Sequence, residues 1–196
     1  MSDTPAEPGV PGPPTHATGV PGPAPYAPEG IGPARPVDAD EFRTAVGRLP
    51  AGVAVVTVRW RGSVHAMTAS SIVSASLEPP LLVFGVHVDA RLREALDDAD
   101  TWAVSVLADD QGAVADWLAS PGRPTIDQLT RVPHRPGLVS GAPWVEGAAA
   151  WFDCRTSAVH RAGDHDLVVG EVVALAQGAA ERGGLVHLRG RMRPLR

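Results

Sequence analysis

Short runs of branched and other apolar residues, each bounded by turn residues, recur along this chain from residue 51 onward. The first run, 51–59, is rich in valine, follows Pro50, and is followed by the turn-forming segment 60–63. Runs of this length predict strands rather than helices, because branched side chains pack well on a pleated sheet. The same pattern predicts further strands at 65–76, 81–88, 102–107, 148–160, 166–176 and 185–192.

Three short helices are expected beside these strands, at 39–48, 90–98 and 109–118. Asp38 can cap the first of them, with Glu41 three residues later. The helices do not divide the strands into regular βαβ units, and no GxGxxG motif follows a strand. We therefore expect a mainly β (α+β) fold built as a closed or partly closed antiparallel barrel, with a doubly wound parallel sheet as the weaker alternative.

The first 36 residues differ in composition from the rest of the chain. They contain 11 prolines and 6 glycines and few apolar residues that could build a core. This composition predicts a disordered Pro/Gly-rich tail over 1–36, followed by one domain over 37–196. The tail is interpreted as a dispensable leader, with a docking tether as the alternative.

Charge and residue usage exclude several functions. The net charge is -5, which argues against a nucleic-acid partner, and the absence of lysine excludes a Schiff-base or P-loop lysine. Cys154 is the single cysteine, so no intrachain disulfide can form, and we expect no metal site. No run approaches the roughly 18 apolar residues of a membrane span, and no secretory leader is recognisable, so we expect a cytoplasmic protein without membrane contact.

The segment 67–80 is unusually rich in hydroxyl groups. Thr68 and four serines fall within nine positions, and such side chains suit the polar edge of a flavin ring or a mononucleotide phosphate. They equally suit the solvent face of an amphipathic strand. Shortly after, a strand ends before Asp89 and Arg91 opens a helix, where free N–H groups and a guanidinium favour a phosphate. Asp89 is predicted as the N-cap of that helix.

Four ordered blocks together resemble the flavin reductase-like domain family. They are Phe42 to Arg48, Ala51 to Thr57, the hydroxyl-rich segment ending at Leu81, and Ala162 to Val172. The resemblance implies an FMN-binding split β-barrel, Greek-key-like and antiparallel, with short flanking helices. It also implies a homodimer and an NAD(P)H:flavin oxidoreductase that reduces FMN or FAD with NADH or NADPH and supplies reduced flavin to a partner monooxygenase.

The same resemblance implies the site residues. The flavin would contact Thr68, Ala69, Ser70, Ser71, Ile72, Ser74 and Ala75, and its phosphate end would lie near Asp89, Ala90 and Arg91. The nicotinamide nucleotide would bind at Gly163, Asp164 and His165. The chain departs from the family in having Ser70 where asparagine is frequent and Ile72 where phenylalanine is common.

His165 lies between two aspartates, which leaves a metal ligand, a structural histidine and a nucleotide contact open; the nucleotide contact is preferred. His65 and His87 could line the site or be ordinary strand residues. Hydride passes between the two ring systems themselves, so no catalytic side chain is assigned. The alternative functions are a pyridoxamine phosphate oxidase-like or deazaflavin-dependent split-barrel oxidoreductase, and a non-catalytic flavin-binding module.

Overall fold

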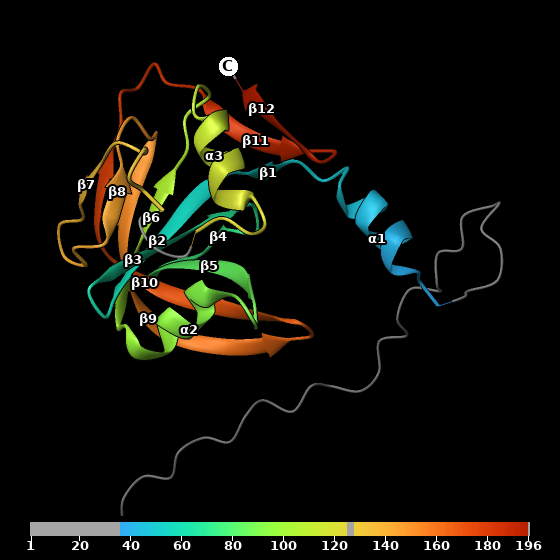
Figure 1. The fold of residues 1–196 in the computed structure, drawn as a ribbon, viewed down its shortest axis with the longest axis horizontal. Coiled ribbons are helices and arrows are strands. Elements are labelled where there is room, and N and C mark those ends of the chain that lie inside the picture. The colour runs from blue at the N-terminus through green and yellow to red at the C-terminus, as the bar shows by residue number, and fades with distance from the viewer. Residues whose placement is uncertain (1–35, 125–127, 196) are drawn as a thin grey trace, which may run out of the picture. The chain divides into compact units, whose positions relative to one another are not determined.

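A curved antiparallel sheet of seven strands forms the body of the structure. The computed structural model describes residues 36–124 and 128–195. The sheet consists of β2 (Ala54–Trp60), β3 (Ser63–Ala69), β4 (Val73–Leu77), β5 (Pro80–His87), β6 (Thr101–Val106), β9 (Ala150–Ala162) and β10 (His165–Gln177). Their order across the sheet is β3-β2-β6-β9-β10-β5-β4 (Figure 1).

Smaller elements surround this sheet. A three-stranded sheet has the order β1-β11-β12, and β7 pairs with β8. Within residues 36–124 and 128–195, three helices accompany the strands, each eight residues long. The bounds are α1 (Ala39–Val46), β1 (Ala51–Gly52), α2 (Arg91–Asp98), α3 (Gly112–Ala119), β7 (His134–Pro136), β8 (Pro143–Val145), β11 (Gly184–Leu188) and β12 (Arg191–Leu195).

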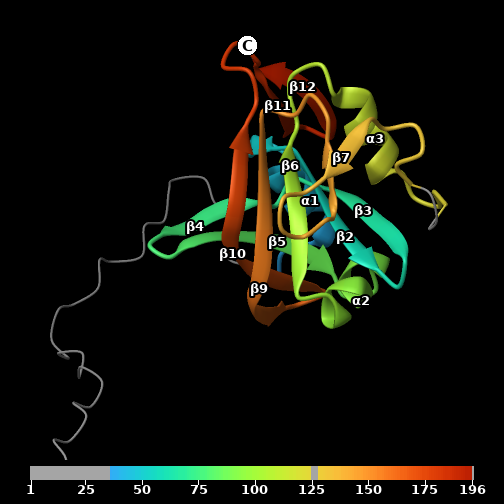
Figure 2. The ribbon, with the colours of Figure 1, turned by 90° about the vertical axis from the view of Figure 1, so that its left-hand side faces the viewer.

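The two edge strands of the large sheet, β3 and β4, are consecutive in the chain, and residues 70–72 join them. The sheet curves until β3 lies beside β5, yet no ladder of hydrogen bonds joins β3 to β4 or β5 within the described residues. The barrel is therefore split at this position. Figure 2 shows the β4–β5 hairpin extending to one side of it. The expected antiparallel split barrel is confirmed.

The inside of the barrel is filled by apolar side chains of β2, β5, β6 and β10, including Val56, Phe84 and Trp102. The rings of Phe84 and Trp102 meet edge to face with their centroids 5.0 Å apart. Leu92 and Leu96 of α2 join the same cluster and close one end of the barrel. Residues 54–58 of β2 are buried on both faces, which explains why this strand reads as a continuous apolar run.

Two expected strands are each divided in two. The strand predicted at 65–76 is interrupted at 70–72, and the one predicted at 185–192 is the β11–β12 hairpin. Its turn residues Arg189 and Gly190 have φ of 53° and 71°, as a tight hairpin turn of the I′ type requires. The predicted cap is confirmed, because the Asp38 carboxylate accepts hydrogen bonds from the N–H groups of Asp40 and Glu41.

Residues 1–35, where the tail is predicted, lie outside the described residues. None of the described helices combines the length and apolar content needed to cross a bilayer. Cys154 is fully buried, and burial raises the pKa of its thiol to about 12, so it is a core residue rather than a nucleophile. Trp102, Trp144 and Trp151 are also buried.

Candidate functional site

The hydroxyl-rich segment passes from one edge of the split barrel to the other. Thr68 and Ala69 end β3, Ser70 to Ile72 cross the gap, and Ser74 and Ala75 lie in β4. The hydroxyl of Thr68 donates to the carbonyl of Ala115 in α3 at 2.8 Å. Ala69 is buried in the barrel core. Both residues hold the start of the segment in place.

Ser71 anchors the crossing to β5. Its hydroxyl donates to the carbonyl of Gly85 and accepts from the N–H of Gly85, each at 3.1 Å. A Cβ on Gly85 would lie 3.2 Å from the Ser71 oxygen, so glycine is what allows this close approach. Ser70 is half-buried beside it. The hydroxyl of Ser71 is thus a structural bridge across the split.

An apolar cavity of about 270 Å³ opens at the end of the barrel next to β4. Ile72 and Ser74, two of the predicted flavin contacts, lie on its wall. Ala75 lies at a register shift between β4 and β5, because Ser74 pairs with Leu82 and Ser76 pairs with Leu81. Such a bulge redirects side chains and is frequent beside binding sites. The cavity is lined by Gly52, Val53, Ala54, Ile72, Val73, Ser74, Leu82, Val104, Val106 and Phe152.

The start of α2 differs from the prediction in one respect. Ala90, not Asp89, is the N-cap, and no side chain in the described part of the chain caps this helix. Asp89 is wrongly predicted as the cap because its carboxylate is exposed, while its backbone N–H donates to Nδ1 of His87 at 3.2 Å. Arg91 is exposed and pairs with Glu94 at 3.1 Å. The first turn of α2 therefore still presents uncapped N–H groups beside a guanidinium.

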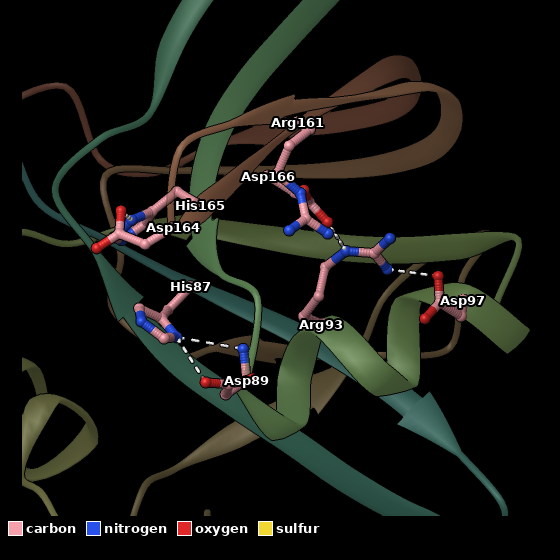
Figure 3. Close-up of polar contacts among 8 residues, drawn as sticks. All are labelled: His87, Asp89, Arg93, Asp97, Arg161, Asp164, His165 and Asp166. Atoms are coloured by element: carbon pink, nitrogen blue, oxygen red, sulfur yellow. Dashed lines mark hydrogen bonds and ion pairs between the residues drawn. The ribbon is translucent and has the colours of Figure 1, made fainter.

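Two of the three predicted nucleotide residues, Gly163 and Asp164, form the two-residue turn between β9 and β10, and His165 begins β10. Ala162 pairs with His165, and Gly163 has φ of 67°, which only glycine adopts freely at the first turn position. Nδ1 of His165 lies 2.7 Å from a carboxylate oxygen of Asp164. Across the ladder, His165 faces His87 of β5, and the rings meet edge to face at 5.3 Å (Figure 3).

A carboxylate with two guanidinium partners fixes α2 against this hairpin. Asp166 accepts from Nε of Arg93 at 2.6 Å and from Nε of Arg161 at 2.7 Å, and Arg93 also pairs with Asp97 (Figure 3). The hydrogen bond from Arg93 is the largest cause that lowers the pKa of Asp166, and the charge of Arg161 adds to it. The i, i+4 spacing of Arg93 and Asp97 predicts their ion pair from the sequence. The contact of Arg93 with Asp166 has no such sequence signal, because the two residues are far apart in the chain.

His65 and His160 differ from the histidines of this edge in their surroundings. His65 is buried against Trp60, with ring centroids 5.4 Å apart, and burial lowers its pKa, so it is a core histidine. His160 is exposed on β9 opposite Leu167. Residues 36–124 and 128–195 contain no group of three or more histidine, cysteine or carboxylate side chains able to hold a metal ion.

The two predicted groups of residues converge on one strand. Ser71 contacts Gly85, and His165 pairs with His87, only two residues further along β5. At about 3.3 Å per residue, the two attachment points are about 7 Å apart. The structure thereby brings together segments from residues 68–75, 89–91 and 163–165.

The chain is similar to known proteins both in sequence and in structure. Residues 46–196 match the model of the Flavin reductase like domain. The chain is 38% identical over 159 residues to an NADH-dependent FAD reductase of Streptomyces globisporus, covering 81% of this chain and 86% of that protein. It is 39% identical over 153 residues to an NADH-dependent FMN reductase of Streptomyces nodosus subsp. asukaensis, covering 76% of this chain and 81% of that protein.

A solved structure with a similar fold is the flavin reductase component of a bacterial two-component tryptophan halogenase. Its TM-score is 0.76 at 38% identity, and the match covers 81% of this chain and 98% of that one. A Streptomyces globisporus NADH:FAD oxidoreductase, solved with NAD and FAD fragments, gives a TM-score of 0.74 at 36% identity over 82% of this chain and 96% of that one.

The cluster around Asp166 predicts a stability effect. Asp166→Asn keeps the shape but leaves Arg93 and Arg161 without their shared carboxylate, so the melting temperature at pH 7 should fall. Because the folded-state pKa lies below the ordinary value of 3.8, the stabilisation is present above that value and is lost as pH falls through the folded-state pKa. The difference in melting temperature between wild type and variant should therefore shrink below about pH 4.

Asp97→Asn is the matched control, because Asp97 is exposed and pairs with Arg93 but not with Arg161. Its melting temperature should stay close to wild type. An equal loss in the two variants would show that Asp166 does not have the structural role assigned to it.

Proposed function

This chain belongs to the flavin reductase like domain family, and we propose that it is an NADH-dependent reductase of FMN or FAD. The observation that carries the proposal is the convergence of the hydroxyl-rich crossing and the Gly163–His165 turn on β5. Hydride transfer requires two flat rings in contact, so their binding segments must be neighbours. The relatives named above as NADH-dependent support NADH as the nucleotide.

The chemistry of the lining fits a flavin. Ile72, Leu82 and Phe152 offer an apolar wall to a flat ring, while Ser74 offers a hydroxyl to its polar edge. A bound flavin supplies a ring nitrogen that accepts the hydride of the reduced nicotinamide. The protein then has to position both rings and exclude water, and no side chain has to transfer a proton.

The phosphate end of the flavin is assigned to the start of α2. The uncapped N–H groups of the first turn and the exposed guanidinium of Arg91 form an anion-binding combination. Glu94 pairs with that guanidinium at 3.1 Å, so a bound phosphate would compete with Glu94 for it.

The reductase assay tests the proposed activity. Purified protein mixed anaerobically with NADH should bleach added FMN or FAD, and NADH oxidation in air should depend on added flavin. A variant that begins at Val37 should keep its turnover, because we propose that residues 37–196 form the catalytic domain. Flavin binding without NADH oxidation would favour a binding module, and a tenfold loss on truncation would contradict the domain assignment.

We further propose a homodimer that supplies reduced flavin to a partner oxygenase or halogenase. Val73 and Leu77 of the edge strand β4 are 58% and 89% exposed, and apolar exposure on an unpaired edge is typical of an interface. The similar halogenase reductase component supports such a partner. Sedimentation should give twice the chain mass of 20.4 kDa, and Leu77→Glu should lower it. A wild-type protein that sediments as a monomer would contradict the dimer.

Arg91→Ala tests the phosphate assignment. Losing a charge-assisted hydrogen bond should weaken FMN binding by about 1 to 3 kcal/mol while leaving riboflavin binding unchanged, because riboflavin has no phosphate. Titration of each flavin by fluorescence measures both affinities. Glu94→Gln is the control, since it frees Arg91 and should not weaken FMN. Equal losses for FMN and riboflavin would show that Arg91 does not contact the phosphate.

A further inference from the structure

Two histidines lie side by side at the edge of the barrel where the nucleotide is expected. His87 ends β5 and His165 begins β10, and the ladder pairs them directly. Their rings are 5.3 Å apart at an interplanar angle of 79°, and each side chain is 47% exposed. The two rings therefore lie next to each other and both are partly exposed to solvent (Figure 3).

The hydrogen bonds of His87 fix its tautomer. The backbone N–H of Asp89 points at Nδ1 of His87 from 3.2 Å, and a backbone N–H can only donate. The nearest carboxylate oxygen of Asp89 is 3.9 Å from the same nitrogen, beyond hydrogen-bond distance. Nδ1 of the neutral ring is therefore the acceptor, and Nε2 carries the hydrogen.

His165 has the opposite tautomer. Its Nδ1 lies 2.7 Å from the Asp164 carboxylate, and this hydrogen bond is the largest cause that lowers the pKa of Asp164. An ionised carboxylate can only accept, so Nδ1 of His165 carries the hydrogen. The Nε2 of the neutral ring is left with a lone pair.

The pair consequently presents one donor, Nε2–H of His87, and one acceptor, Nε2 of His165. Neither nitrogen has a partner among residues 36–124 and 128–195. A metal ion would need lone pairs from both rings, whereas His87 presents a hydrogen, and no third ligand joins them in the described part of the chain. A primary carboxamide, with a C=O acceptor and an N–H donor on one carbon, is the complementary group.

We propose that His87 and His165 together recognise the carboxamide of the nicotinamide ring, His87 donating to its oxygen and His165 accepting from its N–H. This inference rests on the proposed reductase function. Holding the carboxamide at two points fixes the rotation of the ring in its plane and so determines where its hydride-bearing carbon lies. His87 is then a binding residue rather than an ordinary strand residue.

The test compares NADH with its thionicotinamide analogue, in which sulfur, a weaker hydrogen-bond acceptor, replaces the carboxamide oxygen. His87→Phe keeps a ring of similar shape against His165 but removes the donor. The kcat/KM for NADH should fall about two- to twelvefold, the range of one neutral hydrogen bond, while the analogue loses little. The ratio of the two kcat/KM values should fall by the same factor.

Two further variants serve as controls. His87→Gln restores a side-chain N–H donor and should recover most of the ratio, whereas His160→Phe changes an exposed histidine outside the pair and should leave it unchanged. A structural role for His87 would alter both nucleotides equally. His87→Leu, a second variant without a donor, gives the same comparison if the phenylalanine variant does not fold.

The outcomes separate the two proposals. An active wild-type enzyme whose ratio is unchanged in both donor-less variants overturns the carboxamide contact and leaves the reductase function intact. A wild-type protein that does not oxidise NADH in a flavin-dependent manner overturns the reductase function, and this inference with it. A lowered ratio that the glutamine variant restores supports the contact.

Discussion

The hydroxyl of Ser71, hydrogen-bonded in both directions to the backbone of Gly85, connects the two sides of an otherwise open barrel. The large sheet leaves β3 and β4 as unpaired edges within the described residues, so its own ladder does not close the gap. The crossing segment closes it instead, and the position of Ile72 and Ser74 on the cavity wall follows from that attachment. An edge that would otherwise expose unpaired backbone groups becomes one side of the proposed flavin site.

The strand that receives this contact also carries the second half of the site. β5 pairs with β10 along seven residues, and the ladder ends at His87 and His165. The cluster of Asp166 with Arg93 and Arg161 holds α2 against the same hairpin. The helix start proposed for the flavin phosphate is thus fixed relative to the turn proposed for the nucleotide. Rigid positioning of this kind is what hydride transfer demands of a protein.

The polar groups at this edge also show how a neighbouring hydrogen bond determines whether a histidine acts as a donor or as an acceptor. Asp89 was expected to cap α2, yet its backbone N–H binds His87 and its carboxylate stays in solvent. That one bond makes His87 a donor on its open side, while Asp164 makes His165 an acceptor. Two identical residues thereby present opposite hydrogen-bonding groups.

The sequence by itself determined the local features: the strand-forming runs, the Asp38 cap and the glycine that the β9–β10 turn requires. These depend on neighbouring residues, through backbone sterics and short-range hydrogen bonds. The tertiary structure decided where the strand breaks, at 70–72. It also decided which distant residues meet: Ser71 with Gly85, Arg93 with Asp166, and His87 with His165. Strand order depends on the free energy of burying whole apolar faces together. This free energy is distributed over the entire core, so no short stretch of sequence predicts it.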